Sequence, residues 1–225
     1  MIFGLGLLLL VSDGSAQPTA GTRNDLKFED RSVTVVEPEL DADGFFPKGP
    51  ASVCIEGPPR RQCYKAGEGD WIFGRYPAAE VVQLDKETSA VFFSAASGGV
   101  SGFVVHFALL RPGVRDDLED LFSRDVSVSE QGEHAFWNVA EISEAPIFVT
   151  ADYVWGSEEG HYSWHRFIVS TYVRIFDREL EEFRYYLEDR YMTVQKYESG
   201  NANVLASEKQ EILARLRRVK AEEKH

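Results

Sequence analysis

The sequence has no apolar run long enough to cross a membrane as a helix. The run at its start, Ile2–Val11, has ten residues, about half of the roughly 20 that a spanning helix needs. Basic residues are also scarce, with 24 Lys and Arg against 37 Asp and Glu and a formal net charge of −13. Because such an acidic chain repels phosphate backbones, we do not expect nucleic acid as a partner. Because the apolar run is short, we expect no membrane span.

Cysteine is nearly absent, since the chain contains only two, Cys54 and Cys63. They lie close together around a Gly-Pro-Pro turn, and no further Cys or His lies nearby to complete a metal site. The sequence therefore predicts one local disulfide, which closes a short loop and stabilises the fold by about 3 kcal/mol. We predict no cofactor and no metal ion.

Residues 1–16 have the pattern of a secretory signal peptide. An uncharged apolar run is followed by small residues at Gly14 and Ala16, which suit cleavage after Ala16. No Lys or Arg precedes the run, so the alternative is an apolar N-terminus of a cytosolic protein. With the paired cysteines, the pattern predicts an exported protein, periplasmic or extracellular.

Apolar runs that are typical of β-strands fill the middle of the chain. Ala90–Ala96 and Phe103–Leu110 are joined by a glycine-rich turn and are apolar at both odd and even positions. This pattern predicts a central β-hairpin that is covered on both faces. Val126–Val128 is expected to be a further short strand.

Longer strands are predicted towards the C-terminus, within Ile147–Trp155, His165–Phe176 and Phe183–Tyr197. In the last of these the apolar phase changes, which indicates a bulge near Glu188, Asp189 and Arg190. Ser207 and Gln210 form a capping box, which predicts a C-terminal helix over residues 208–223.

The predicted fold is therefore mainly β, an antiparallel sandwich or a curved, barrel-like sheet. The C-terminal helix packs on it, and the spacing of Leu118, Leu121 and Phe122 predicts a short mid-chain helix over residues 116–122. We expect residues 17–50 to be an extended lead-in in which only Val33–Val36 is a strand, and residues 51–225 to form one domain.

The segment between two predicted strands, residues 155–165, is the densest in chemically active side chains. His161 and His165 have a spacing that binds metal on a helix, but strands flank them here and the glutamate of the HExxH motif is missing. Its aromatic rings beside carboxylates suit sugar binding, although aromatic residues also simply favour strands. The candidate ligand-binding residues are Trp155, Glu158, Glu159, His161, Tyr162, Trp164 and His165.

No motif identifies a reaction. Ser97 and Ser101 flank two glycines without forming the G-x-S-x-G elbow of serine hydrolases. We therefore predict an exported, non-catalytic protein that binds a small ligand, a glycan or a protein partner. The alternative is a secreted hydrolase that uses histidine and carboxylate groups of the 155–165 loop, with or without a metal ion. No catalytic residue can be named from the sequence.

Overall fold

A computed structural model describes residues 22–57, 60–68, 71–98, 102–113, 117–160, 162–198 and 203–222. The chain is mainly β, with three antiparallel sheets and one C-terminal helix. The predicted signal peptide lies outside the described residues, so both it and export stay predictions.

The first sheet has the strand order β1-β2-β3-β4. Its strands are β1 (Thr22–Phe28), β2 (Arg31–Val36), β3 (Ser52–Glu56) and β4 (Gln62–Lys65). The second sheet has the order β10-β8-β7-β6-β5, and β9 also pairs with β8. Its strands are β5 (Gly67–Glu68), β6 (Trp71–Gln83), β7 (Ser89–Ser97), β8 (Val104–Pro112), β9 (Leu118–Asp120) and β10 (Val126–Ser129).

The third sheet has the order β11-β12-β13-β14, and β15 pairs with β13. Its strands are β11 (Glu133–Trp137), β12 (Ile147–Val154), β13 (Trp164–Asp177), β14 (Glu182–Met192) and β15 (Tyr197–Glu198). The helix α1 (Val204–Glu222) follows them.

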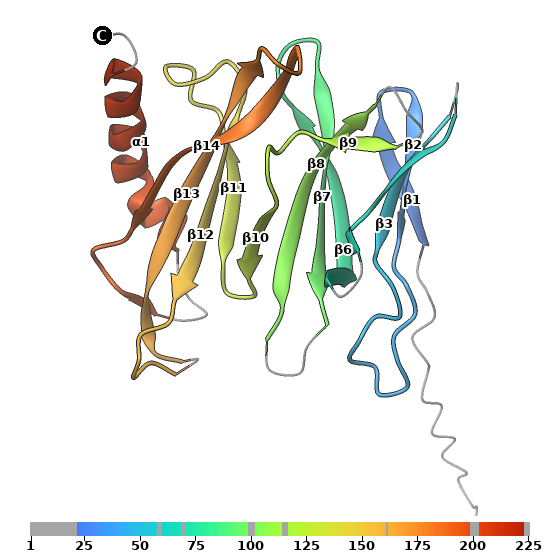
Figure 1. Cartoon of the computed structure of the whole chain (residues 1–225), viewed down its shortest axis with the longest axis horizontal. Helices are drawn as coiled ribbons and strands as arrows, with labels where there is room; N and C mark the ends of the chain where they lie inside the picture. Colours follow the sequence, from blue (N-terminus) through green and yellow to red (C-terminus); the bar gives the residue numbers. More distant parts are fainter. Residues whose placement is uncertain are drawn as a thin grey trace, which may run out of the picture.

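The three sheets and the helix follow one another along the long axis of the molecule, from the first sheet on the right of Figure 1 to α1 on the left. An apolar core fills each of the three spaces between them. The core between the first and second sheets contains Val53, Ile55, Phe93 and Leu110 among others. The core between the second and third sheets contains Phe92, Phe107, Phe148 and Tyr185 among others. The core between the third sheet and α1 contains Val149, Val169, Leu213 and Leu216 among others.

The predicted central hairpin is confirmed as β7 and β8. Adjacent residues of β7 belong to different cores, since Phe93 faces the first sheet and Phe92 faces the third. Both side chains are almost fully buried. The apolar residues on both faces of these strands therefore reflect a sheet that is covered on two sides.

The prediction of a mid-chain helix is wrong. Leu118–Asp120 is the strand β9, which pairs with Pro112–Leu110 of β8. The Asp120 carboxylate accepts hydrogen bonds from the backbone N–H groups of Leu109 and Phe122. Because strand pairing and this carboxylate bind the backbone, the helical spacing of the apolar residues here has no effect.

The bulge predicted in β14 is confirmed. Thr171 of β13 lies opposite Asp189, whereas Tyr172 lies opposite Leu187. Glu188 is thus the extra residue, and the side chains on either side of it alternate in opposite phases.

The predicted disulfide is confirmed between Cys54 and Cys63. The two residues lie directly opposite each other on β3 and β4, with their Cα atoms 4.1 Å apart. A disulfide is consistent with an exported protein.

The segment predicted as a lead-in contains two strands rather than one. β1 pairs with β2, and β2 pairs with β3, so residues 22–36 form half of the first sheet. Phe28 and Val33 are buried in its core. The residues of β1 are mostly polar, so the sequence carries no apolar pattern that indicates this strand.

The C-terminal helix is confirmed and begins at Val204, earlier than the capping box predicts. Its apolar side packs on the third sheet through Ile212, Leu213 and Leu216. The Glu133 carboxylate of β11 accepts hydrogen bonds from the backbone N–H groups of Val204 and Leu205. The cap is therefore provided by a strand far away in the sequence, not by Ser207.

Candidate functional site

The loop between β12 and β13 brings three of the predicted site residues together. The Nδ1 atom of His165 lies 2.8 Å from Oε2 of Glu159. The ring centroid of His165 lies 5.3 Å from that of Trp155 and 5.1 Å from that of Tyr153. The imidazole is fully buried, and its Nε2 atom has no hydrogen-bond partner among the described residues.

Glu159 is the centre of a polar network in this loop. Its carboxylate accepts hydrogen bonds from the Lys196 ammonium and from the backbone N–H of Gly156. The Lys196 hydrogen bond, followed by those from Gly156 and His165, lowers the pKa of Glu159 to about 2. The carboxylate is thus ionised and held by three donors, which orients the buried imidazole.

The remaining predicted residues of the loop are not gathered at this network. Glu158, Tyr162 and Trp164 are exposed, with 93% of Tyr162 and 58% of Trp164 accessible to solvent. His161 lies outside the described residues. Sequence spacing paired His161 with His165, whereas the described partner of His165 is Glu159.

A small cavity of about 200 Å³ adjoins the network. Trp155 and Glu159 line it together with residues that the sequence analysis did not select, namely Lys196, Arg166 and Met192. Arg166 follows the loop directly on β13, whereas Met192 and Lys196 lie at and after the end of β14 and are brought to the loop by the tertiary fold.

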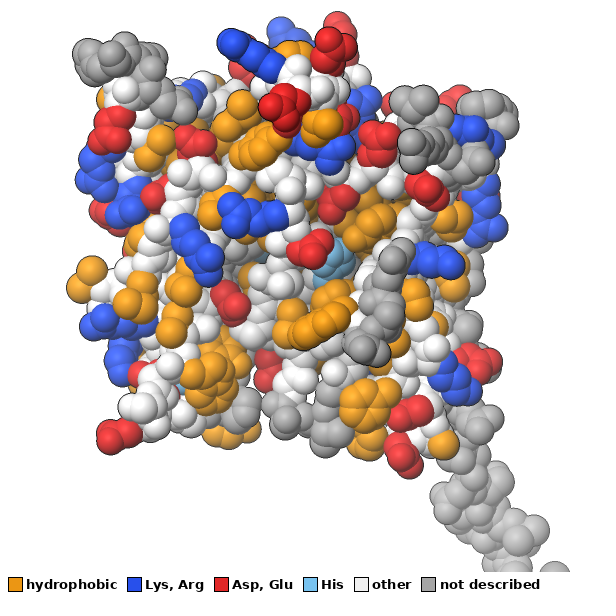
Figure 2. All heavy atoms as spheres, in the orientation of Figure 1, with side chains coloured by type: hydrophobic (Ala, Val, Ile, Leu, Met, Phe, Trp, Pro, Cys, Tyr) orange, Lys and Arg blue, Asp and Glu red, His pale blue; other side chains and the backbone are white. Residues whose placement is uncertain are grey.

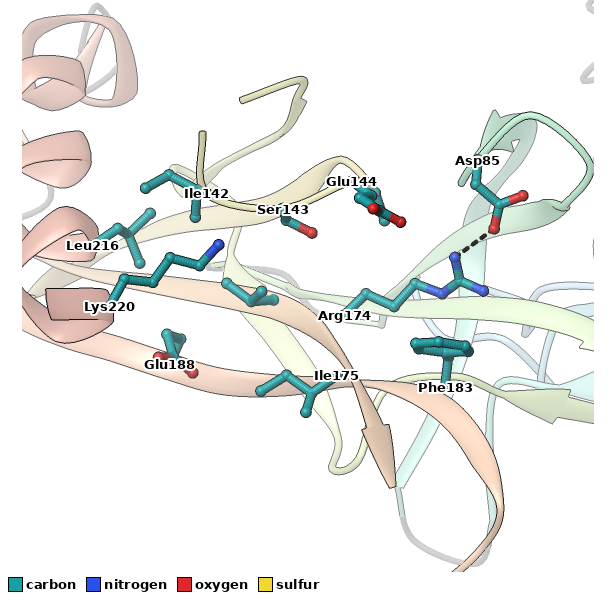
Figure 3. Close-up of a pocket in the computed structure, with 12 residues that line it drawn as sticks. Asp85, Ile142, Ser143, Glu144, Arg174, Ile175, Phe183, Glu188, Leu216 and Lys220 are labelled. Atoms are coloured by element: carbon teal, nitrogen blue, oxygen red, sulfur yellow. Dashed lines mark hydrogen bonds and ion pairs between the residues drawn. The ribbon is translucent and has the colours of Figure 1, made fainter. Parts of the chain in front are cut away.

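A larger pocket, of about 500 Å³, lies between α1, the far end of β13 and β14, and the loop before β12 (Figure 3). Its apolar lining consists of Ile142, Ala145, Val173, Ile175, Phe183 and Leu216. Its charged lining consists of Asp85, Glu144, Arg174, Glu188 and Lys220. This size and mixture of apolar and polar side chains are typical of a binding site.

The pocket exists because β12 begins one residue after a proline. The last pair between β12 and β13 is Phe148 with Tyr172, so the same register would place Pro146 opposite Arg174. Proline has no N–H to donate to a neighbouring strand. The loop before Ile147 therefore leaves the sheet, and β13 beyond Tyr172 has no partner on this side among the described residues.

The backbone of Arg174 faces this open edge. Arg174 lies opposite Tyr185 of β14, but the N–H and C=O of Tyr185 bond to Leu121 and Ser123 instead. Arg174 and Tyr185 thus form a non-hydrogen-bonded pair of the antiparallel ladder, in which both backbones direct their polar groups outward. The N–H and C=O of Arg174 make no backbone hydrogen bond to another described residue.

The Arg174 side chain is held at one end of the pocket. Its Nη1 atom lies 2.7 Å from Oδ2 of Asp85, and its guanidinium carbon lies 4.4 Å from the centre of the Phe183 ring. The hydrogen bond from Arg174 is the main cause that lowers the pKa of Asp85 to about 2. The Lys220 ammonium points into the pocket from α1 (Figure 3) and forms no ion pair with another described residue.

None of the residues that line this pocket is among the site residues predicted from the sequence. The alternation of polar and apolar residues along β13 does place Arg174 on the more polar face of the strand. This pattern is the sequence feature that could have indicated the pocket. The pocket depends on where the pairing of β12 with β13 ends. The sequence does not indicate this register, because a long loop joins the two strands.

Comparison with known proteins gives no relative, because no family model, no curated protein and no solved structure matches this chain. In the part of the chain that the structure describes, no helix is long and apolar enough to span a bilayer. The described residues also contain no group of three or more His, Cys, Asp or Glu that could hold a metal ion. Figure 2 shows basic, acidic and hydrophobic side chains interspersed over one face of the molecule.

Proposed function

We propose that this chain is a non-catalytic binding protein that holds an extended peptide segment of a protein partner in the pocket at the edge of β13. The observation that carries the proposal is the open strand edge at Arg174, whose N–H and C=O have no backbone partner among the described residues. An extended peptide supplies the complementary C=O and N–H groups and adds a strand to the sheet.

The surroundings of the edge support a peptide rather than a purely apolar ligand. Ile175 and Phe183 are partly exposed, with 39% and 47% of their surfaces accessible, and can cover apolar side chains of the peptide. Lys220 on one side and Glu144 on the other offer charges of both signs. Binding through the main chain gives affinity, and such side-chain contacts select the sequence.

A synthetic hexapeptide library, screened against the purified full chain, provides the probe. Peptides that bind are remade with a single N-methyl group at each backbone amide in turn. Strand addition predicts loss of binding at alternate amides only, because every second N–H of an added strand faces β13. Equal tolerance of N-methylation at every position would contradict the proposal.

A pair of matched variants locates the binding. Ile175→Asp places a charge in the pocket wall and is expected to weaken peptide binding by about tenfold or more. Leu180→Asp places the same charge in the β13–β14 turn, where the side chain is exposed and does not line the pocket, and should bind as the wild type does. Equal binding by both variants would move the site elsewhere.

The hydrolase alternative at the 155–165 loop stays a prediction. The contact between His165 and Glu159 favours acid–base chemistry, but the imidazole is fully buried and a substrate would need it to open. Glycan binding by the exposed Trp155 and Trp164 also stays a prediction, and a glycan array with Trp164→Ala as control tests it.

A further inference from the structure

A second cleft, separate from the pocket at the edge of β13, lies between the second and third sheets. The faces of the two sheets pack through Phe107, Phe148 and Tyr185 over part of their length. Further along, the same face of β12 and β13 carries Thr150 and Ser170 in place of aromatic residues. The space there is a cleft of about 200 Å³ with a mostly polar lining.

Hydrogen-bond donors gather in this cleft without partners in the described chain. The side chains of Thr150, Ser170 and Tyr172 are all buried, with at most 8% of their surfaces exposed. No hydrogen bond between these hydroxyl groups and another described residue is seen. None of the three hydroxyl oxygens is among the fully buried polar atoms without a partner, so they face the open space of the cleft and can donate to a group bound there.

Two guanidinium groups, those of Arg124 and Arg190, line the same cleft. Neither forms an ion pair with a described residue. Both are close enough to Tyr172 to act electrostatically on its hydroxyl group, against the larger effect of burial, which raises the pKa of Tyr172. The two arginines thus approach one tyrosine from different elements, the segment before β10 and the end of β14.

The charged side chains that line the cleft balance each other, since two carboxylates accompany the two arginines. The carboxylates are those of Asp125 and Asp152. Asp152 is already occupied, because its Oδ1 atom accepts hydrogen bonds from the backbone N–H and the hydroxyl of Ser129. These hydrogen bonds orient the Asp152 carboxylate but leave its charge, so the two guanidinium groups match the two carboxylates in charge and form no ion pair with a described residue.

We infer that this cleft binds a small oxyanion, a phosphate or carboxylate group, between Arg124 and Arg190. The planar guanidinium groups bind such anions through two parallel hydrogen bonds, and the hydroxyl groups of Ser170 and Tyr172 donate to the remaining oxygens. The site needs no peptide in the pocket at β13, since the two share no lining residue.

Calorimetric titration of the full chain with inorganic phosphate, and separately with succinate, tests the inference at constant ionic strength. Binding of either anion is expected in the wild type, and the two arms distinguish a phosphate site from a carboxylate site. Arg190→Gln and Arg124→Gln are each expected to weaken binding by about tenfold or more, because each removes a charged hydrogen-bond donor. Arg178→Gln is the matched control, since Arg178 is exposed in the β13–β14 turn and lies outside the cleft.

Amide chemical shifts of the wild type provide a measurement that does not depend on the variants' folding. Phosphate or succinate should move the resonances of Ser127, Thr150 and Ser170. Absence of binding by both anions, shifts confined to other residues, or equal binding by folded Arg190→Gln and Arg178→Gln would each overturn the inference.

Discussion

The Oε1 atom of Glu133 accepts a hydrogen bond of 2.8 Å from the backbone N–H of Val204, the first residue of α1. Its Oε2 atom accepts a second, of 2.9 Å, from Leu205. One carboxylate therefore satisfies two of the free N–H groups at the start of the helix and places a negative charge at the positive end of the helix dipole. Through this contact β11 fixes where α1 begins.

Replacing Glu133 by alanine should lower the free energy of unfolding by about 1 to 2 kcal/mol, because the cap and its charge are both lost. Urea denaturation measures the change. Glu130→Ala, at an exposed position just before β11, is the control and should leave stability nearly unchanged. Equal midpoints for the two variants would show that Glu133 does not cap the helix.

The helix also illustrates what could be predicted from the sequence. Its amphipathic spacing predicts the element correctly, because the spacing depends only on local residues. Its first residue depends on Glu133, which is brought close by tertiary folding. The error at Leu118–Asp120 has the same cause, since pairing with β8 outweighs the helical spacing of three apolar side chains.

Substitution of Leu216 by aspartate should destabilise the fold by about 3 kcal/mol or more, because it buries a charge in the core between α1 and the third sheet. Leu216 is 1% exposed. Arg218→Asp introduces the same residue on the solvent side of the helix and should cost much less. Thermal denaturation of both variants makes the comparison, and an unchanged melting temperature for Leu216→Asp would show that the helix does not pack there.

The stability of the wild type should depend on pH through Asp120. Burial raises the pKa of this carboxyl group from 3.8 to about 7, against the hydrogen bonds from Leu109 and Phe122. The folded state therefore holds a proton that the unfolded state has lost, so stability due to this group is present below about pH 4 and is lost as the pH rises through about 7.

The difference in unfolding free energy between the wild type and Asp120→Asn isolates this effect from His106 and His134, whose pKa values are lowered by desolvation and act in the opposite direction. Asparagine keeps an acceptor for the two N–H groups. The wild type should lose stability relative to Asp120→Asn between about pH 4 and about pH 7 in urea titrations. The exposed Asp43→Asn serves as control, and parallel profiles for the wild type and Asp120→Asn would contradict the prediction.

Removal of the disulfide by the double substitution of Cys54 and Cys63 with alanine should lower the free energy of unfolding by about 2 to 3 kcal/mol. The oxidised wild type should contain no free thiol by mass spectrometry. Reductant should shift the wild-type denaturation curve onto that of the double variant. Two free thiols in the purified native protein would refute the pairing.

The two neighbours Trp164 and His165 should respond very differently to alanine. His165 is fully buried, so His165→Ala leaves a cavity and removes one of the three donors to Glu159, and it should cost about 2 to 3 kcal/mol. Trp164 is 58% exposed, so Trp164→Ala should cost less than about 1 kcal/mol. Urea denaturation gives both values, and the reverse order would show that the loop is packed differently.

The 155–165 loop and the pocket at β13 differ in how far the sequence predicts them. Residues of one loop are close in sequence, so the proximity of Trp155, Glu159 and His165 could be anticipated. The pocket depends on the register of β12 and β13, which would place Pro146 opposite Arg174 if the pairing continued past Phe148 and Tyr172. Its other wall comes from α1, and no local pattern places Lys220 beside β13.

The alternation of Phe92 and Phe93 between two cores has a consequence for how the molecule melts. Separation of the first sheet would expose the face of β7 that carries Phe93 to water. Separation of the third sheet would expose the face that carries Phe92. Either event exposes a large apolar surface to water while β7 and β8 are still paired, and this exposure is unfavourable in free energy. The outer sheets are thus coupled through the hairpin between them, and the three sheets should lose their structure in one cooperative transition.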